Sequence, residues 1–330
     1  MRSQIAPLVA SIRRTALIGF PEDQNCGNHA NWLGALKLLS ELGLEVVYSA
    51  PWSSVDRDLL SARVGSGVIF LSHALFAPDS SVPAKLLISL PNRAVLLPEP
   101  VPATGSIAPA LAAAISRHPD RFIFARDSVA KKALEQAFAG RAGIEMAPPL
   151  SFMLGPHRRK ADPEYDIVWI ARTGRKDSSV EGAARLLTQS AEKLDLPGFP
   201  DGLDIDVVVK RRPPTVMLTD WSSLVFRGQE ARLACNALDP RSRAQAYVDR
   251  GLHILSLGRV VITDRAGAHV ACLLLDLPHV FCGDGSGRNR AFFESWSKDS
   301  ETCRFADTPA KAWSLARSML RGIKAGDAAS

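Results

Sequence analysis

The chain has 330 residues, of which 46% are hydrophobic and 22% are charged, and its formal net charge is +6. This length is enough for two domains of ordinary size, and the composition is typical of a soluble globular protein. No run of 18 or more apolar residues occurs, and Arg13 and Arg14 interrupt the apolar stretch near the start. We therefore expect neither a membrane span nor a signal peptide.

The cysteines and histidines show no spacing typical of a disulfide framework or a metal site. The five cysteines are scattered and form no Cys-x-x-Cys pair. This pattern favours reduced thiols in a cytoplasmic protein, without a metal and without a bound cofactor. Two basic clusters, at residues 157–160 and 210–212, lack interleaved aromatic residues. They favour solvated loops or a basic cleft for a small anionic substrate over nucleic-acid binding.

The first half of the chain alternates short apolar runs with helical patterns. We predict strands at residues 15–20, 45–50, 67–71, 94–97, 122–125 and 144–147. Predicted helices lie between them at residues 29–42, 82–90, 107–116 and 128–138. Strands that alternate with helices indicate βαβ units and a mostly parallel sheet covered on both faces.

A polar stretch at residues 155–164 contains two prolines and interrupts this alternation. A second series follows, with predicted strands at residues 166–171, 205–209, 216–219, 260–263 and 279–282. Its predicted helices lie at residues 180–193, 244–257, 268–275, 290–297 and 309–323. The pattern predicts an α/β protein with an N-terminal Rossmann-like domain at residues 1–156 and a linker at 157–165. A C-terminal Rossmann-like domain then covers residues 166–330, and its last helix is a candidate to pack back on the first domain.

Ligands in such sheets bind outside the carboxyl ends of the strands, so we expect a site in the cleft between the two domains. The first candidate segment is residues 19–34, which follow the first strand and open a helix. Asn25, Gly27 and Asn28 there form a small polar turn that can bring backbone N–H groups close to a phosphate or carboxylate. An ordinary turn with a helix N-cap is the alternative. The segment has no Gly-x-Gly-x-x-Gly pattern, and the chain has no P-loop pattern.

Arg126 and Asp127 are the second candidate, because they lie where the strand at 122–125 gives way to a helix. The Arg126 guanidinium can present two donors to a carboxylate or phosphate. A structural Arg–Asp pair is the alternative, and Asp127 or Ser128 can cap the helix that follows.

The third candidate is the strand–turn–helix at residues 259–280. Arg265 lies at the start of the predicted helix, where free N–H groups and the helix dipole favour an anion. His269 follows one helical turn later and can exchange a proton with the same ligand, although a lone histidine on a helix is more often structural. The fourth candidate is the glycine-rich loop after residue 282, which carries Arg288 and Asn289 into the next helix. A solvated loop is the alternative.

Taken together, these segments resemble the polysaccharide pyruvyl transferase family, from about residue 20 to residue 296. The resemblance rests on four stretches in the same order: Asn25-Cys-Gly-Asn28 with Trp32-Leu-Gly34, Phe124-Ala-Arg-Asp-Ser128, Ile262-Thr-Asp-Arg265 through Pro278-His-Val280, and Gly287-Arg-Asn289 with Phe293-Glu-Ser-Trp296. The chain departs from the family at three places. Ala266 and Gly267 stand where members have Leu-His, Asn28 replaces an acidic residue, and residues 72–76 replace a glycine-rich loop.

The resemblance implies two Rossmann-like domains in a glycosyltransferase-B-like arrangement. It also implies transfer of a pyruvyl group from phosphoenolpyruvate to a sugar hydroxyl in exopolysaccharide or cell-surface glycan biosynthesis. Phosphoenolpyruvate and a sugar or glycan acceptor would be the partners, with Arg126, Arg265 and Arg288 binding the donor and His269 acting as acid or base. Two alternatives remain open: a nucleotide-sugar glycosyltransferase and a non-catalytic relative that binds a glycan or a protein. The sequence also leaves open the oligomeric state and any peripheral association with a lipid-linked glycan.

Overall fold

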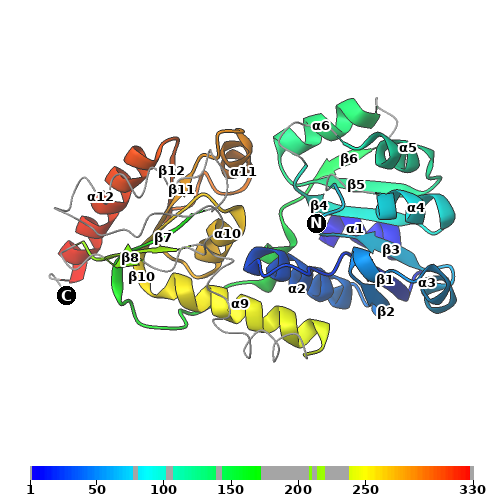
Figure 1. Ribbon diagram of the computed structural model, residues 1–330, viewed down its shortest axis with the longest axis horizontal. Coiled ribbons are helices and arrows are strands. Elements are labelled where there is room, and N and C mark those ends of the chain that lie inside the picture. Colours follow the sequence, from blue (N-terminus) through cyan, green and yellow to red (C-terminus); the bar gives the residue numbers. More distant parts are fainter. Residues whose placement is uncertain are drawn as a thin grey trace. The chain divides into compact units, whose positions relative to one another are not determined.

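The computed structural model describes residues 2–76, 81–101, 107–138, 143–171, 208–209, 214–219 and 238–327. The chain divides into two compact units, one made of Met1–Asp23 and Asn28–Leu154 and the other of Gln24–Gly27 and Gly155–Ser330. Each unit contains a six-stranded sheet with helices packed against it (Figure 1). The predicted class, two α/β domains with parallel sheets, is therefore confirmed, whereas the glycosyltransferase-B-like arrangement stays a prediction.

The first unit has a fully parallel sheet with the strand order β2-β1-β3-β4-β5-β6. The chain runs from β1 to β2 on one side and then crosses to β3 on the other. The crevice at the carboxyl ends of β1 and β3 is thus the topological switch point, where such sheets bind ligands. The elements are α1 (Arg2–Val9), β1 (Arg14–Ile18), α2 (Cys26–Glu41), β2 (Glu45–Ala50), η1 (Trp52–Ser54), α3 (Arg57–Val64), β3 (Val68–Leu71), α4 (Ser81–Ser89), β4 (Ala94–Glu99), α5 (Pro109–Arg117), β5 (Arg121–Ala125), α6 (Ser128–Phe138), β6 (Ile144–Met146) and η2 (Leu150–Leu154).

The core of the first unit follows the alternation of side chains along its strands. Ala16 and Ile18 of β1 belong to one apolar cluster with buried residues of α3, α4, α5 and α6. Leu17, which lies between them, is equally buried and points to the opposite face. That face is covered by α1 and α2, which bury Ile5 and Trp32. Near-continuous apolar strands, such as residues 68–71, are the consequence of burial on both faces.

Gly34 of α2 lets this helix pack directly on the backbone of η2. A Cβ atom at position 34 would lie 1.9 Å from the carbonyl oxygen of Leu150. We therefore expect Gly34→Ala to lower the free energy of unfolding by roughly 1 to 3 kcal/mol, measured by urea unfolding. Gly322 of the last helix, α12 (Pro309–Asp327), is the matched control, because a Cβ there meets nothing within 4 Å. Gly322→Ala should stabilise by up to about 1 kcal/mol, and equal effects of the two substitutions would contradict the packing argument.

The second unit has the strand order β12-β11-β10-β7-β9-β8, parallel except for β8, which pairs antiparallel with β9 at the edge. The chain occupies β8 and β9 on one side of β7 and then β10 on the other, so the switch point lies at the carboxyl ends of β7 and β10. The elements are β7 (Tyr165–Ile170), β8 (Val208–Val209), β9 (Val216–Thr219), α9 (Pro240–Ser256), β10 (Gly258–Thr263), α10 (Ala266–Leu274), β11 (His279–Cys282), α11 (Arg288–Trp296), β12 (Cys303–Ala306) and α12 (Pro309–Asp327).

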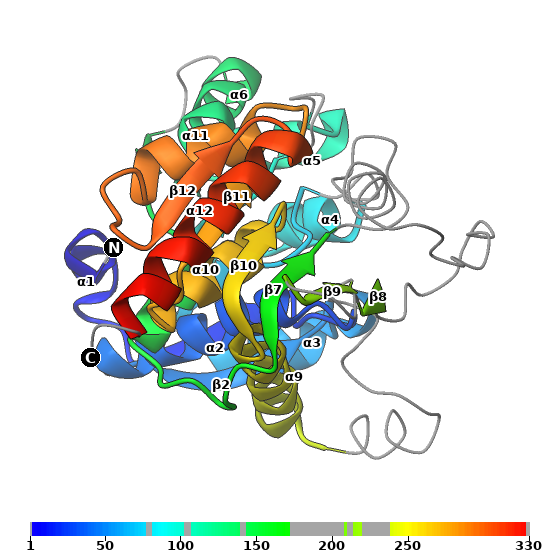
Figure 2. The same ribbon diagram turned by 90° about the vertical axis from the view of Figure 1, so that its left-hand side faces the viewer.

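The last helix, α12, packs on the sheet of its own unit. Its Trp313 stacks on Trp169 of β7 at a centroid distance of 6.3 Å, and its buried side chains join the cluster formed by one face of the sheet. Figure 2 shows α12 lying along β10, β11 and β12. The apolar stripe of α12 is therefore used by the sheet of the second unit. The expectation that this helix also packs back on the first domain stays a prediction.

Most predicted elements in the described ranges occur within a few residues of their predicted bounds. The predicted strands at 45–50, 216–219 and 279–282 and the predicted helix at 128–138 match the structure residue for residue. Helices α1 and α3 and strand β12 were not predicted. The predicted helix at 180–193, most of the predicted strand at 205–209 and the basic cluster at 210–212 lie outside the described residues. The stretch from Gly155 to Glu164 contains no helix or strand, and the His157 N–H donates to the Leu274 carbonyl of the second unit.

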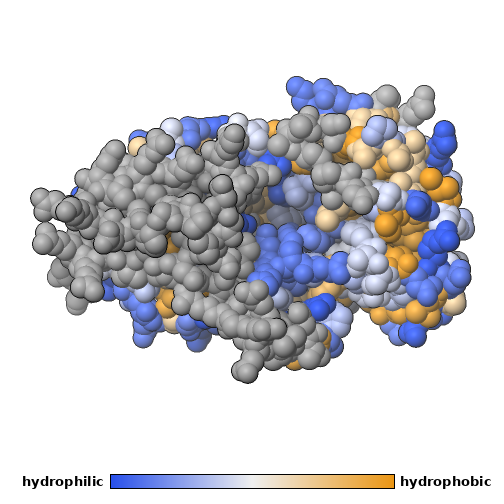
Figure 3. Space-filling view, in the orientation of Figure 1, coloured by the Kyte–Doolittle hydropathy of each residue, from blue (hydrophilic) through white to orange (hydrophobic). Residues whose placement is uncertain are grey.

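Exposed large hydrophobic side chains on the first unit belong to its helices. Leu59 of α3, Ile88 of α4 and Val129 of α6 are examples, with Ile88 70% exposed. On the face shown in Figure 3, hydrophobic and hydrophilic residues are mixed across this unit, at the right of the view. None of the helices in the described part of the chain combines the length and the apolar character needed to cross a membrane.

Candidate functional site

The loop that follows β3 has an unusual backbone and lies at the switch point of the first sheet. His73 and Ala74 adopt positive φ angles of 29° and 59°, a region that residues with a Cβ rarely occupy. Residues 72–76 are also the segment that stands where the resembled family carries a glycine-rich loop, and glycine adopts such angles without steric cost. The observed backbone therefore fits that resemblance, although the residue types differ.

Buried hydrogen bonds hold this loop in place. The His73 N–H and the Ser72 hydroxyl both donate to Oε1 of Glu99, at 3.0 Å and 3.1 Å. The Trp52 indole N–H donates to the His73 carbonyl oxygen at 2.7 Å. Glu99 ends β4 and is only 6% exposed. A carboxylate on the neighbouring strand thus fixes the strained turn that carries His73.

The His73 side chain faces Asp23, which lies in the loop after β1. Nε2 of His73 is 3.5 Å from Oδ2 of Asp23, and the same oxygen accepts a hydrogen bond from Nδ2 of Asn28 at 2.7 Å. The carbonyl oxygen of Asp23 contacts Nε2 of His29 at 2.8 Å. About a fifth of the His73 side chain, 21%, remains exposed. Asp23 and His73 therefore meet at the carboxyl ends of β1 and β3.

Charge and burial shift the pKa values of Glu99 and His73 in opposite directions. Burial raises the pKa of Glu99 above its usual range, and the charges of His73 and Arg126 reduce that rise. Burial of the His73 imidazole lowers its pKa, but the hydrogen bond to Asp23 and the charges of Glu99, Asp23 and Glu22 outweigh burial and raise the pKa of His73 above 6.5. We call Asp23, Ser72, His73, Glu99 and Arg126 the first-unit site.

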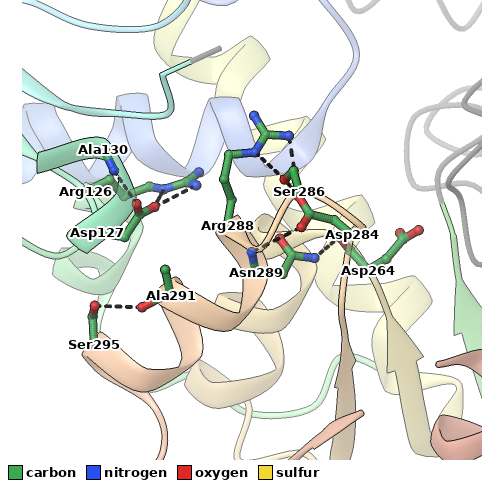
Figure 4. A network of polar contacts seen from close by, with 10 residues as sticks. All are labelled: Arg126, Asp127, Ala130, Asp264, Asp284, Ser286, Arg288, Asn289, Ala291 and Ser295. Carbon is green, nitrogen blue, oxygen red and sulfur yellow. Dashed lines mark hydrogen bonds and ion pairs between the residues drawn. The ribbon is translucent and has the colours of Figure 1, made fainter. Parts of the chain in front are cut away.

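Arg126 forms the structural Arg–Asp pair that the sequence offered as an alternative, and its predicted contact with an anion stays a prediction. Its Nε and Nη2 atoms each lie 3.0 Å from Oδ2 of Asp127, and Oδ1 of Asp127 accepts the N–H of Ala130 at 2.8 Å (Figure 4). Asp127 thus caps α6 and fixes the guanidinium at the end of β5. The side chain of Arg126 is 12% exposed, and its charge acts on Glu99.

Asn25, Gly27 and Asn28 lie at the start of α2. Oδ1 of Asn25 accepts the N–H of Gly27 at 3.0 Å, so Asn25 caps the first turn. Asn28 donates its side-chain amide to Asp23, which connects it to the first-unit site. Their predicted contact with an anion stays a prediction.

The second unit gathers polar residues at the carboxyl ends of β10 and β11. Nδ2 of Asn289 donates to the carbonyl oxygen of Asp264 at 2.7 Å (Figure 4). It also donates to the carbonyl oxygen of Cys282 at 2.8 Å. Asn289 is buried, so both of its amide hydrogens join the two strand ends. Arg288 donates from Nε to Ser286 Oγ at 2.9 Å, and its Nη2 lies 3.4 Å from Oδ2 of Asp284. Asn289 therefore positions the loop between β11 and α11, and Arg288 supplies a positive charge at the end of this loop.

Arg265 occupies the N-cap position of α10, at the switch point of the second sheet. It has an extended backbone, its N–H donates to Thr263 Oγ1 at 3.0 Å, and its side chain makes no cap hydrogen bond. The predicted position of Arg265 at the start of a helix is therefore confirmed, and the first-turn N–H groups and the helix dipole favour an anion there. The binding of an anion by Arg265 stays a prediction. We call Asp264, Arg265, Asp284, Arg288 and Asn289 the second-unit site.

His269 lies in the core of the second unit instead of at its strand ends. It is fully buried and stacks on Phe281 at a centroid distance of 4.1 Å. Its Nδ1 is 2.8 Å from Nε2 of His279, and its Nε2 is 2.9 Å from Oγ of Ser297. Burial lowers the pKa of His269 and lowers that of His279 to about 4. A buried neutral ring with both nitrogens occupied gives no support to the prediction of His269 as acid or base.

A neutral hydrogen-bond chain accounts for these ring nitrogens. Nδ1 of His279 must donate to the Leu277 carbonyl oxygen at 2.7 Å, so its Nε2 accepts. Nδ1 of His269 then donates to that acceptor, and Nε2 of His269 accepts from the Ser297 hydroxyl. The Sγ atom of Cys303 lies 3.8 Å from Nδ1 of His269, and the donor atoms of the two histidines and this cysteine lie within 4.8 Å of one another. Within the described ranges this is a potential metal-binding group, but the hydrogen bonds satisfy it without an ion.

Four residues of the first-unit site are not among the site residues that the sequence predicts: Asp23, Ser72, His73 and Glu99. Each follows or ends a predicted strand, which is the position where parallel sheets place ligand-binding groups. The charge coupling of His73 to Glu99 and Asp23, however, joins residues 26 positions apart or more, in loops that only the strand order brings together. The sequence does not reveal this strand order, so it does not show that these residues meet.

Comparison with known proteins agrees with this architecture. No family model matches the sequence. The structure is similar to that of a functionally uncharacterized protein from Klebsiella pneumoniae subsp. pneumoniae NTUH-K2044, with a TM-score of 0.60, 12% identity and coverage of 93% of this chain and 99% of that one. A putative UDP-N-acetylglucosamine 2-epimerase from Listeria monocytogenes gives a TM-score of 0.40 at 10% identity, covering 83% and 79% of the two chains. The first likeness and the strand orders define a two-domain α/β protein of Rossmann-like topology.

A sequence comparison is more specific than this structural class. Pyruvyl transferase 1 of Schizosaccharomyces pombe (strain 972 / ATCC 24843) is 24% identical over 310 residues, which cover 87% of this chain and 70% of the relative. The chain is therefore related to the pyruvyl transferase family.

Proposed function

We propose that the protein transfers a pyruvyl group from phosphoenolpyruvate to sugar hydroxyls, forming a ketal in the biosynthesis of an exopolysaccharide or cell-surface glycan. We place the reaction in the cytoplasm. The observation that carries this proposal is the match to Pyruvyl transferase 1 along most of the chain. The cations and polar groups at the switch points of both sheets support it, because a small anionic donor requires such groups.

The donor carries a phosphate and a carboxylate, and both need fixed cations. We assign these roles to Arg126, Arg265 and Arg288. Arg126 is held by Asp127, and Arg288 by Ser286 and Asp284, so neither guanidinium has to be ordered when the donor binds. The N–H groups at the start of α10 add partial positive charge beside Arg265. Stabilisation of the departing phosphate would supply a large share of the catalysis.

The purified chain incubated with phosphoenolpyruvate and a panel of methyl hexopyranosides tests the proposal. We expect phosphate release that depends on the sugar, together with a pyruvyl ketal detectable by mass spectrometry. The control is Arg265→Ala, which should abolish most of the release. Phosphate release by the unaltered chain no faster than by Arg265→Ala would contradict the proposal.

A thermal-shift measurement separates this function from the alternatives. Phosphoenolpyruvate should raise the melting temperature, because a ligand that binds only the folded chain stabilises it. Stabilisation by a nucleoside diphosphate and not by phosphoenolpyruvate would instead indicate a nucleotide-sugar glycosyltransferase. The absence of a shift with either ligand would indicate a non-catalytic relative.

A further inference from the structure

Formation of the ketal needs a proton donor, and the position of His269 in the core of the second unit gives no support for this role. The methylene carbon of phosphoenolpyruvate must gain a proton, and an attacking hydroxyl must lose one. His269 has no exposed nitrogen for either step. The first unit, by contrast, has an imidazole at the switch point of its sheet, 21% exposed and facing a carboxylate. A proton-transfer group is best placed at such a partly open position with its charge stabilised by neighbours.

We infer that His73 is the residue that transfers the proton in the pyruvyl transfer, and that Asp23 and Glu99 position it. This inference rests on the proposed function. Glu99 holds the backbone of residue 73 in its left-handed conformation through the His73 N–H. Asp23 faces Nε2 of the ring at 3.5 Å, so it favours the protonated ring and fixes its orientation. Backbone and side chain of His73 are thus each held by a different carboxylate.

The proton and the bonds balance over one reaction. Protonated His73 gives its proton to the methylene carbon, so the C=C bond is replaced by a C–H bond and the central carbon becomes electrophilic. The first sugar hydroxyl forms a C–O bond to that carbon and returns its proton to His73. The second hydroxyl forms the second C–O bond as the bond to phosphate breaks, and its proton leaves with the phosphate. His73 therefore ends in the state in which it began, and no further reactant is required.

The charged groups around His73 set the pH range in which it can act. Glu22 and Asp23 face it from the loop after β1, and Glu99 faces it from the end of β4, with Arg126 acting on Glu99 from β5. Because the three carboxylates favour the protonated ring, the reaction rate should fall as the pH rises through the His73 pKa. Removal of a carboxylate charge should move this fall to lower pH.

The test compares substitutions that keep shape and change charge. His73→Gln should lower kcat with phosphoenolpyruvate and the methyl hexopyranoside panel by roughly 100- to 10,000-fold and remove the fall at high pH. Asp23→Asn and Glu99→Gln each keep a carbonyl acceptor for their hydrogen-bond donors. They should retain more activity than His73→Gln and shift the fall to lower pH. His253→Gln on α9 is the matched histidine control and should behave as the unaltered chain does.

The outcomes separate this inference from the proposed function. If the unaltered chain forms the ketal and His73→Gln keeps its rate and pH profile, the role of His73 is wrong and the proposed function stands. If Asp23→Asn and Glu99→Gln lower the rate without moving the pH profile, the two carboxylates act only on folding and their positioning role is wrong. If the unaltered chain forms no ketal, the proposed function fails and the inference fails with it.

An NMR titration measures the coupling between His73 and Glu99 directly. The signal of the His73 ring, assigned by its loss in His73→Gln, should give a pKa above 6.5, and this pKa should fall in Glu99→Gln. A pKa unchanged in Glu99→Gln would overturn the coupling to Glu99.

Discussion

Replacing Arg126 by alanine should lower kcat/KM for phosphoenolpyruvate by roughly 100- to 1,000-fold. This is the usual cost of removing one fixed hydrogen-bond donor that stabilises a charged transition state. Arg126 lies at the end of β5 with its guanidinium fixed by two 3.0 Å contacts to Asp127. Its charge also acts on Glu99. Loss of Arg126 therefore removes a cation that is ordered before the donor arrives. Steady-state kinetics over a range of phosphoenolpyruvate concentrations measures the effect.

The same substitution has a second consequence that must be separated from the first. Asp127 is 2% exposed and loses its ion-pair partner in Arg126→Ala, so the protein should also become less stable. The assay is therefore run below the melting temperature of each variant. Arg126→Lys keeps the charge but not the planar pair of donors, and it should recover part of the rate.

Arg121 provides the matched control for Arg126. It lies on the same strand but at its amino end, where it donates to the carbonyl oxygen of His118. Because ligands of parallel sheets bind at the carboxyl ends, Arg121→Ala should leave kcat/KM unchanged. Equal losses in Arg121→Ala and Arg126→Ala would show that loss of stability, and not loss of a donor-binding cation, causes the effect.

The elements that the sequence predicts best are those in which apolar period and boundary signals agree. Helix α6 was predicted residue for residue, because Asp127 marks its start and an apolar stripe follows. Helix α3 was not predicted, since its eight residues bury only Leu60 and Val64, and its N-cap Asp56 precedes no clear apolar period. Short helices that bury few side chains show no clear hydrophobic period, so the sequence does not predict them.

The candidate site shows a different limit of sequence reasoning. The sequence proposes Arg126 and Arg265 because each comes at the end of a buried strand, Arg126 directly after β5 and Arg265 two positions after the last residue of β10. His269 was placed one turn after Arg265 and expected on the same face, but α10 is only nine residues long and the second turn lies in the core. His73 carries no comparable signal in the sequence, because its contacts with Glu99 and Asp23 depend on the order of β1, β3 and β4 in the sheet. Helical spacing alone does not tell which turn of a short helix faces solvent.

The buried histidine pair of the second unit makes the protein sensitive to mild acid. Burial lowers the pKa of His279 from 6.5 to about 4, and burial together with the charge of His279 lowers that of His269. A histidine with a lowered pKa in the folded state contributes stability that is fully present above its unfolded pKa, because both states are then neutral. As the pH falls below about 6.5, the unfolded chain takes up the proton first and is favoured. His279 alone should cost about 3 kcal/mol by pH 4.

Urea unfolding at a series of pH values between 7 and 4 measures this loss. Carboxylates with lowered pKa values affect the free energy of unfolding only at lower pH. Burial raises the pKa of Asp166, but the hydrogen bonds from Thr215 and Lys324 outweigh it, so the stability it contributes is lost only below 3.8. His118 of the first unit, whose pKa is also lowered by burial, contributes in the same direction as the pair. The loss between pH 6.5 and 4 therefore comes from the buried histidines with lowered pKa values, and the raised pKa of buried Glu99 offsets part of it.

A substitution assigns that loss to the pair. His279→Asn removes the titrating ring, so the variant should be less stable at pH 7 but should lose less of its remaining stability between pH 6.5 and 4. His118→Asn is the matched control, since it removes a buried histidine of the other unit and should leave the contribution of the pair intact. If His279→Asn and the unaltered chain show the same dependence on pH, the pair is not neutral in the folded protein. In that case the hydrogen-bond chain from Leu277 through His279 and His269 to Ser297 has a different proton arrangement, and a metal ion shared with Cys303 would become the explanation to test.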